Sequence, residues 1–199
     1  MQFDPNNLEQ SAIYKLLTGS IIPRPIGWIS TIDENGINNL APFSYFNIVG
    51  EKHVMFSTAK SKGNNKDTLN NVLSNNEFVV NMVTEDLVEE MNNTAAELAP
   101  HEDEFLHANL TPIASSIIKP NRVKEAKISF ECKMIHQYTL PNEYNNGATM
   151  VIGEIVMMHF DDNVLLDNYK INLETYKPIS RLAGSNYAKL GELFSIKRS

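Results

Sequence analysis

The stretch from residue 26 to residue 41 constrains the fold most, because it encodes two strands joined by a tight turn. The segment from Ile26 to Ile32 alternates, with Ile26, Trp28 and Ile32 on one face, a period that is typical of a strand. Asn35-Gly36 follows, and this dipeptide tolerates positive φ at both central positions of a hairpin turn. The return strand is expected from Ile37 to about Ala41. Pro42 cannot donate to a sheet ladder, so a bulge or an exit from the sheet is expected there.

Further strands are expected along the rest of the chain. Short ones are predicted at Val54–Thr58 and Phe78–Val83. Lys127–Met134 alternates cleanly, which predicts Ile128, Phe130, Cys132 and Met134 on the inner face and Lys127, Ser129, Glu131 and Lys133 on the outer one. Thr149–Phe160 is apolar on nearly both faces, so a helix or a second subunit should cover its outer side.

Three segments show helical patterns. The first is Leu8 to Leu17, which Gly19 is expected to stop. The second is 67–73, with Asp67 or Thr68 near its start. The third is an acidic helical insert at about 84–110, where Thr94 and Glu97 have the spacing of a capping box and Pro100 ends a turn.

These elements predict one mainly β domain over residues 1–199, a barrel of about six antiparallel strands with short inserted helices. A doubly wound α/β fold would need regular strand–helix alternation and a glycine fingerprint, which the sequence lacks.

Composition limits the partners. The net charge of −7 argues against general nucleic-acid binding, because phosphate backbones need a positive surface. The N-terminal residues are too polar for a signal peptide, and no apolar run approaches the roughly 20 residues of a membrane helix. One cysteine, Cys132, excludes an internal disulfide and fits a reducing compartment. We therefore expect a cytoplasmic protein without a nucleic-acid or membrane partner.

Residues 57–68 leave a strand and enter a helix. They offer hydroxyl groups, the three lysines Lys60, Lys62 and Lys66, and the free N–H groups of a helix start. Those are the donors of a phosphate site. A solvated surface loop would have a similar composition, and this alternative stays open.

Two further features fit a cofactor site. Arg24 lies between two prolines that stiffen the backbone, so its guanidinium can be presented to a phosphate or a carbonyl group, or it can simply be exposed at a strand entrance. Polar residues at 38–47 surround apolar ones, as a flavin ring would need, although a polar loop over a small core has the same pattern. Trp28 alone is more typical of a core.

Other reactive groups form no recognisable site. The five histidines lack metal-binding spacing with one another or with Cys132, so no metal is expected. Cys132 lies on the inner face of an alternating strand, which is typical of an inert core thiol. No catalytic nucleophile, acid or base can be assigned.

The chain resembles the flavin reductase-like, flavoredoxin-type proteins with the FMN-binding split-barrel fold. The resemblance extends from about Gly19 to Phe194, and its motifs are specific in combination. They are Pro23-Arg24-Pro25-Ile26-Gly27-Trp28-Ile29-Ser30-Thr31, Asn39-Leu40-Ala41-Pro42-Phe43-Ser44-Tyr45-Phe46-Asn47, Lys66-Asp67-Thr68, Phe78-Val79-Val80-Asn81 and Pro178-Ile179-Ser180-Arg181-Leu182-Ala183-Gly184-Ser185-Asn186-Tyr187.

The resemblance implies a six-stranded Greek-key split barrel, a homodimer, and one FMN per subunit. The C-terminal segment 177–199 would close the site. The implied cofactor-binding residues are Asn39, Leu40, Ala41, Ser44, Tyr45, Phe46 and Asn47 around the flavin ring, Ser57, Thr58, Ala59, Lys66, Asp67 and Thr68 around the phosphate, Arg181, Gly184 and Tyr187 from the C-terminal segment, and Arg24 at either the phosphate or a flavin carbonyl.

The implied activity is that of an FMN-dependent oxidoreductase, with NADH or NADPH as a candidate electron donor. Two positions depart from the family pattern. Ala183 replaces the first residue of a C-terminal glycine pair, and Asn146-Gly147-Ala148 stands where many NAD(P)H:flavin reductases carry Gly-Asp-His. The second departure favours a tightly held FMN in a non-catalytic binding protein or an electron carrier, or a reductase for an unknown small-molecule or protein acceptor.

Overall fold

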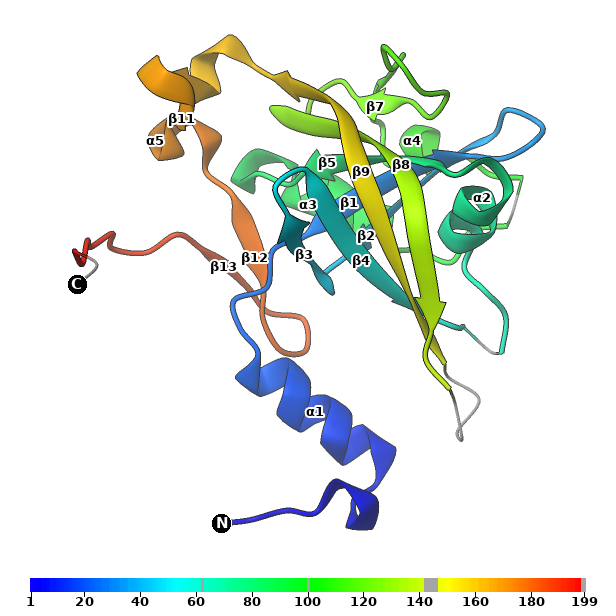
Figure 1. Ribbon diagram of the computed structural model, residues 1–199, viewed down its shortest axis with the longest axis vertical. Helices are drawn as coiled ribbons and strands as arrows, with labels where there is room; N and C mark the ends of the chain where they lie inside the picture. The colour runs from blue at the N-terminus through cyan, green and yellow to red at the C-terminus, as the bar shows by residue number, and fades with distance from the viewer. Residues whose placement is uncertain (62, 100, 142–146, 198–199) are drawn as a thin grey trace.

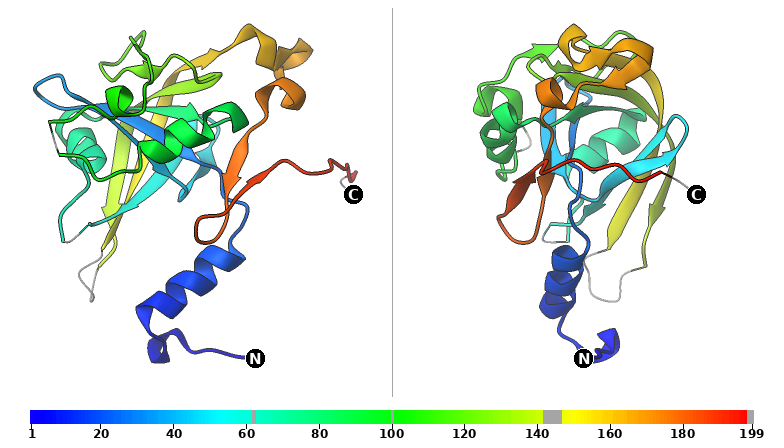
Figure 2. Two further views of the ribbon diagram at one scale, coloured as in Figure 1. Left: turned by 180° about the vertical axis from the view of Figure 1, so that it is seen from behind. Right: turned by 90° about the vertical axis from the view of Figure 1, so that its left-hand side faces the viewer.

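A computed structural model describes residues 1–61, 63–99, 101–141 and 147–197 (Figure 1). Its main element is an antiparallel seven-stranded sheet in the order β2-β1-β5-β8-β9-β4-β3, which curves into a split barrel (Figure 2). The mainly β split-barrel prediction is confirmed. The strands are β1 (Gly27–Ile32), β2 (Asn38–Phe43), β3 (Phe46–Gly50), β4 (His53–Ala59), β5 (Glu77–Met82), β8 (Ile128–Thr139) and β9 (Ala148–Phe160).

The count exceeds six because the expected polar loop after Pro42 contains β3, which pairs with β4. Three two-stranded pairs are added around the main sheet. They are β6 (Pro112–Ile113) with β7 (Arg122–Val123), β10 (Leu165–Leu166) with β11 (Lys170–Ile171), and β12 (Ile179–Arg181) with β13 (Tyr187–Lys189).

The predicted β1–β2 hairpin is present, but two details differ. Gly36 takes φ +85°, whereas Asn35 does not have a positive φ. The Asp33 carboxylate organises the turn instead, since its Oδ1 accepts the N–H groups of Asn35 at 2.9 Å and Ile37 at 2.7 Å. The strand also continues through Pro42, opposite Trp28. Because β2 is the last strand in the sheet order, it tolerates a residue without an N–H donor.

The two faces of β1 enter two different cores. Ile29 packs inside the barrel with Phe56, whose ring centroid lies 5.1 Å from that of Phe43 and 5.3 Å from that of Phe78. Trp28 packs on the opposite side with Met91 and other residues of the helical insert. Both side chains are fully buried, so β1 is covered on both faces rather than exposed to solvent on one.

The helices differ from their predicted bounds. Helix α1 (Gln10–Ser20) runs through Gly19, and the Ser20 hydroxyl donates to the Leu16 carbonyl at 2.7 Å in its last turn. Helix α2 (Asp67–Asn75) has Lys66 as its N-cap, with Asp67 and Thr68 in the first turn. Helix α5 (Leu173–Tyr176) lies after β11.

Among its described residues, the acidic insert is helical only at Glu85–Leu87, α3 (Val88–Asn93) and α4 (Glu104–His107). The predicted capping box is wrong, because Thr94 follows the end of α3 rather than starting a helix. Its hydroxyl instead accepts the Trp28 Nε1–H at 2.8 Å and donates to the Met91 carbonyl. Pro100 lies outside the described residues.

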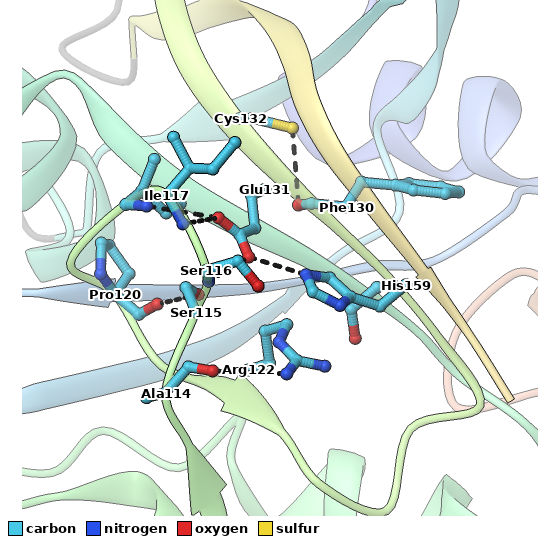
Figure 3. A network of polar contacts seen from close by, with 12 residues as sticks. Ala114, Ser115, Ser116, Ile117, Pro120, Arg122, Phe130, Glu131, Cys132 and His159 are labelled. Carbon is cyan, nitrogen blue, oxygen red and sulfur yellow. Dashed lines mark hydrogen bonds and ion pairs between the residues drawn. The ribbon is translucent and has the colours of Figure 1, made fainter.

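The predicted solvent exposure of the outer face of β8 is also wrong. Ser129 and Glu131 were expected to face solvent, yet both are buried. The segment before β7 lies over them, and the Glu131 carboxylate accepts the N–H groups of Ser116, Ile117 and Ile118 at 2.6–3.2 Å (Figure 3). On the other face Cys132 is buried as predicted, and burial raises the pKa of its thiol.

Candidate functional site

A cavity of about 660 Å³ opens beside one end of the sheet. Its walls come from β2, β4, the start of α2, the insert and the β12–β13 hairpin. Fourteen of the predicted site residues line it: Arg24, Asn39, Ala41, Ser44, Tyr45, Ser57, Thr58, Ala59, Lys66, Asp67, Thr68, Arg181, Gly184 and Tyr187. Residues far apart in the sequence are therefore brought to one hollow.

One end of the cavity carries hydroxyl groups and a helix start. Ser57 and Thr58 end β4 there, and Lys66 precedes the first turn of α2. No side chain among the described residues caps the N-terminus of α2, so its first-turn N–H groups are available to an anion. Lys60 does not line the cavity, and Lys62 lies outside the described residues. The donor set suits a single phosphate group.

Asn39 fixes the wall next to this end. Its amide nitrogen donates to the Thr68 hydroxyl at 2.9 Å and to the Thr31 hydroxyl at 3.2 Å, and all three residues are buried. These bonds tie β2 to the start of α2. They also orient the Thr68 hydroxyl, whose own hydrogen stays free to rotate toward the cavity.

Arg24 is buried and is not an exposed residue at a strand entrance. The residue is 8% exposed, and its guanidinium donates to the carbonyls of Thr18, Ile21 and Leu182 at 2.7–2.9 Å and to the Ser44 hydroxyl at 3.3 Å. The side chain thus ties the end of α1 to the C-terminal segment. Most of its five N–H donors are engaged within the protein.

Three predicted residues do not line the cavity. Leu40 points into the core beside Trp28, because alternate residues of β2 face opposite sides. Phe46 packs its ring against Gly27, where an added Cβ would lie 2.7 Å from the ring. Asn47 is exposed on β3, and its side-chain oxygen Oδ1 accepts the N–H of Ile48.

The C-terminal hairpin borders the cavity through Arg181 and Tyr187. Arg181 pairs with Arg24 through two backbone hydrogen bonds of 3.0 and 2.9 Å, which join the hairpin to the entrance of β1. The Tyr187 hydroxyl donates to the side-chain carbonyl of Asn92 at 3.3 Å. The hairpin is thereby connected to α3 on the opposite wall.

Sequence reasoning missed the contribution of the insert and of α1. Tyr14 and Thr18 of α1 line the cavity together with Met91, Asn92, Thr94 and Glu104 of the insert. Their spacing carries no motif, and only the chain path places them here. The acidic character of the insert was the one available signal.

Glu104 is the most unusual of these residues. Its side chain is buried, and Oε2 accepts the N–H of Leu40 at 3.1 Å. Burial raises the pKa of Glu104 from 4.5 to about 7, and the nearby carboxylates of Asp103 and Asp67 act in the same direction. The carboxyl group is therefore able to change charge near neutral pH.

Within the described part of the chain, no three His, Cys, Asp or Glu side chains are grouped so that they could hold a metal ion. The same residues include no helix that is both long and apolar enough to span a membrane.

Comparison with known proteins gives a consistent result. Residues 18–176 match the model of the "Flavin reductase like domain". An uncharacterized protein of Aquifex aeolicus is 42% identical over 95% of both chains, and YwrF of Bacillus subtilis, also uncharacterized, is 38% identical over 98% of both.

Solved structures are similar over nearly the whole chain. Nitrilotriacetate monooxygenase component B from Bacillus cereus superimposes with a TM-score of 0.94, at 41% identity over 98% of both chains. The 2-nitrobenzoate 2-nitroreductase NbaA from Pseudomonas fluorescens superimposes with a TM-score of 0.88, at 28% identity, over 100% of this chain and 96% of that protein.

Proposed function

Because the chain belongs to the flavin reductase-like family, we propose that it is an FMN-dependent oxidoreductase that transfers hydride or electrons through bound FMN. The acceptor would be a small molecule or a redox protein, and NADH or NADPH the donor. A single cysteine in a buried position favours a cytoplasmic location.

The observation that carries the proposal is the pairing of one phosphate-type donor set with an adjoining wall of mixed polarity in a single cavity. Lys66 and the start of α2 would hold the phosphate of FMN. Ala41, Ser44 and Tyr45 would line the ring, where apolar contact and a few polar groups fix a flavin. Bound FMN would supply the redox centre, and these residues would bind and orient it.

A preference for FMN over FAD is expected at the same cavity, because the described residues at this end include no second phosphate loop rich in glycine. Titration of apo-protein with FMN, FAD and riboflavin, followed by flavin fluorescence, tests the claim. Equal affinities for FMN and riboflavin would contradict a phosphate site.

An electron-carrier or FMN-binding role without catalysis is the second candidate. The specific observation in its favour is the sequence Asn146-Gly147-Ala148 in place of Gly-Asp-His, although Asn146 lies outside the described residues. Anaerobic mixing of FMN-loaded protein with NADH or NADPH separates the two candidates. Bleaching of the flavin absorption faster than a free-FMN control supports the reductase, whereas a bound but unreactive flavin supports the carrier.

Lys66→Ala is expected to weaken FMN binding by about 1–3 kcal/mol, the range for a hydrogen bond to a charged group. Lys66 is at the loop–helix junction and makes no ion pair with another described residue, so the fold should be retained. Thr68→Ala should act in the same direction but less. Fluorescence titration measures both affinities, and Lys60→Ala is the matched control because Lys60 lies outside the cavity lining. Wild-type affinity in both variants would reduce the loop to a surface loop.

We also propose a homodimer. Helix α1 stands away from the barrel in both figures and exposes Leu16 and Leu17, Ile21 is exposed directly after the helix, and β9 exposes Met157 and Met158 (Figures 1 and 2). Monomers seldom expose apolar surface of this extent, and a two-fold partner would cover it.

Sedimentation analysis is expected to give twice the chain mass of 22.4 kDa. Leu17→Asp should shift the protein toward monomer, because it places a charge within the apolar surface of α1. The control is Lys15→Asp, which changes charge at a polar position of the same helix. A wild-type monomer at working concentration would exclude the dimer.

A further inference from the structure

We propose that Arg181, supported by Tyr187, is an anion subsite for the second ligand of the cavity, and that it does not serve the flavin phosphate. The proposal rests on the proposed function, because it assigns the substrate class of the same site. The substrate class is a molecule that carries a carboxylate or a phosphate group.

The cavity has more cationic groups than one phosphate needs. Three described cations line the cavity, namely Arg24, Lys66 and Arg181. Arg24 is buried and bonded to three backbone carbonyls. Lys66 is at the start of α2, where the single phosphate of FMN is proposed to bind. Arg181 is left without an anion that FMN could provide.

Arg181 and Lys66 belong to different elements of the cavity wall. The β12–β13 hairpin and the start of α2 are separate elements that border the same cavity, and Figure 1 draws them apart. Arg181 is half-exposed, so it lines the cavity where a ligand can enter from solvent. We therefore assign the single phosphate at the start of α2 to Lys66 and the second ligand to Arg181.

The Arg181 side chain is held in place by its neighbours on the hairpin. The guanidinium carbon of Arg181 lies 4.6 Å from the centroid of the Tyr187 ring, a cation–π distance. Arg181 also donates to the Tyr187 hydroxyl and to the Gly184 carbonyl. These contacts hold the side chain in place and use two of its five N–H donors.

The remaining donors have no charged partner. Among the residues that the structure describes, no carboxylate lies within ion-pair distance of Arg181, although the chain is acidic overall. Lys189, two residues beyond Tyr187 on the same hairpin, is in contrast paired with Glu85 at 2.7 Å. A fixed, half-exposed guanidinium without a carboxylate partner suits recognition of a planar carboxylate or a phosphate.

Two ligand pairs test the subsite in FMN-loaded protein, with the change in flavin absorption as the readout. Benzoate against benzamide tests a carboxylate, and NADPH against NADH under anaerobic conditions tests the additional phosphate. We expect wild-type protein to bind the more anionic member of one pair about tenfold more tightly. Arg181→Gln should abolish that preference, Arg181→Lys should retain part of it, and FMN affinity should be unchanged in both.

The control is Lys189→Gln, which removes the same charge from the same hairpin but outside the cavity lining. It should preserve the preference. Thermal unfolding shows whether each variant is folded.

An unchanged preference in Arg181→Gln, no preference in the wild type for either pair, or a tenfold loss of FMN affinity in Arg181→Gln would overturn the subsite. Failure of wild-type protein to bind FMN would overturn both this subsite and the proposed function, whereas the other outcomes leave FMN binding intact.

Discussion

Glu104→Gln is expected to stabilise the protein at pH 8 by roughly 3 kcal/mol and to have no such effect at pH 4. Burial raises the pKa of Glu104 from 4.5 to about 7 in the folded state. The folded protein thus binds more protons than the unfolded chain between these values, so stability falls as the pH rises through this window. Above pH 7 the penalty is complete, and each unit of pKa difference corresponds to about 1.4 kcal/mol.

Glutamine removes this penalty because it is neutral at every pH and its carbonyl oxygen can still accept the Leu40 N–H. Denaturant unfolding of both proteins from pH 4 to pH 8 provides the measurement. Glu192→Gln, on the exposed C-terminal tail, removes an equal charge and should lack the pH-dependent gain. Parallel pH profiles of Glu104→Gln and the wild type would contradict the buried, chargeable state of Glu104.

Glu131→Ala is expected to destabilise the protein by roughly 3–5 kcal/mol, the cost of breaking a buried charged network. Both carboxylate oxygens are used, because Oε1 bonds to Ser116 N–H and to His159 Nε2 and Oε2 accepts from Ile117 and Ile118 (Figure 3). Alanine would leave three backbone N–H groups without an acceptor.

The network also gives a pH dependence of the opposite sign. Burial alone would raise the pKa of Glu131, but the N–H donors and His159 hold it below the usual value of 4.5. Its contribution is therefore present above pH 4.5 and lost as the pH falls through the folded-state pKa. Denaturant unfolding measures both effects.

His159→Ala is the partner variant and should cost less, because His159 is partly exposed and the backbone donors remain bonded. FMN affinity should be unchanged in both variants, since neither residue lines the cavity. A loss below 1 kcal/mol in Glu131→Ala would mean that the loop before β7 is held by other contacts.

Much of the fold follows from local patterns in the sequence. The Asn35-Gly36 turn predicts the β1–β2 hairpin, the period of two predicts β8, and short or two-sided apolar runs predict β5 and β9. Most of the site residues that the family motifs predict do line the cavity, because those motifs lie at strand ends and at one helix start, where backbone donors are exposed. These are short-range properties of the chain.

Burial could not be predicted in the same way. The alternation in β8 separates two faces correctly but does not say which is covered, and the loop that covers Glu131 comes from a segment about fourteen residues earlier. The end of α1 and the interruption of the insert were missed for a related reason. Thr94 accepts a hydrogen bond from Trp28, which is distant in the sequence, whereas the Ser20 hydroxyl extends α1 through a bond to Leu16 in the preceding turn that residue preferences do not indicate.

The sequence by itself determined most strands of the main sheet, the β1–β2 hairpin and the residue types of the site, because period, turn chemistry and motif are properties of neighbouring residues. Only the tertiary structure decided the state of the charged groups. Arg24 became a buried tie between chain segments, Arg181 a half-exposed cation at the cavity, and Glu104 a carboxyl group that titrates near neutrality. The physical reason is that desolvation and hydrogen bonding depend on which distant segments pack around a side chain, and the order of residues along the chain does not contain that information in readable form.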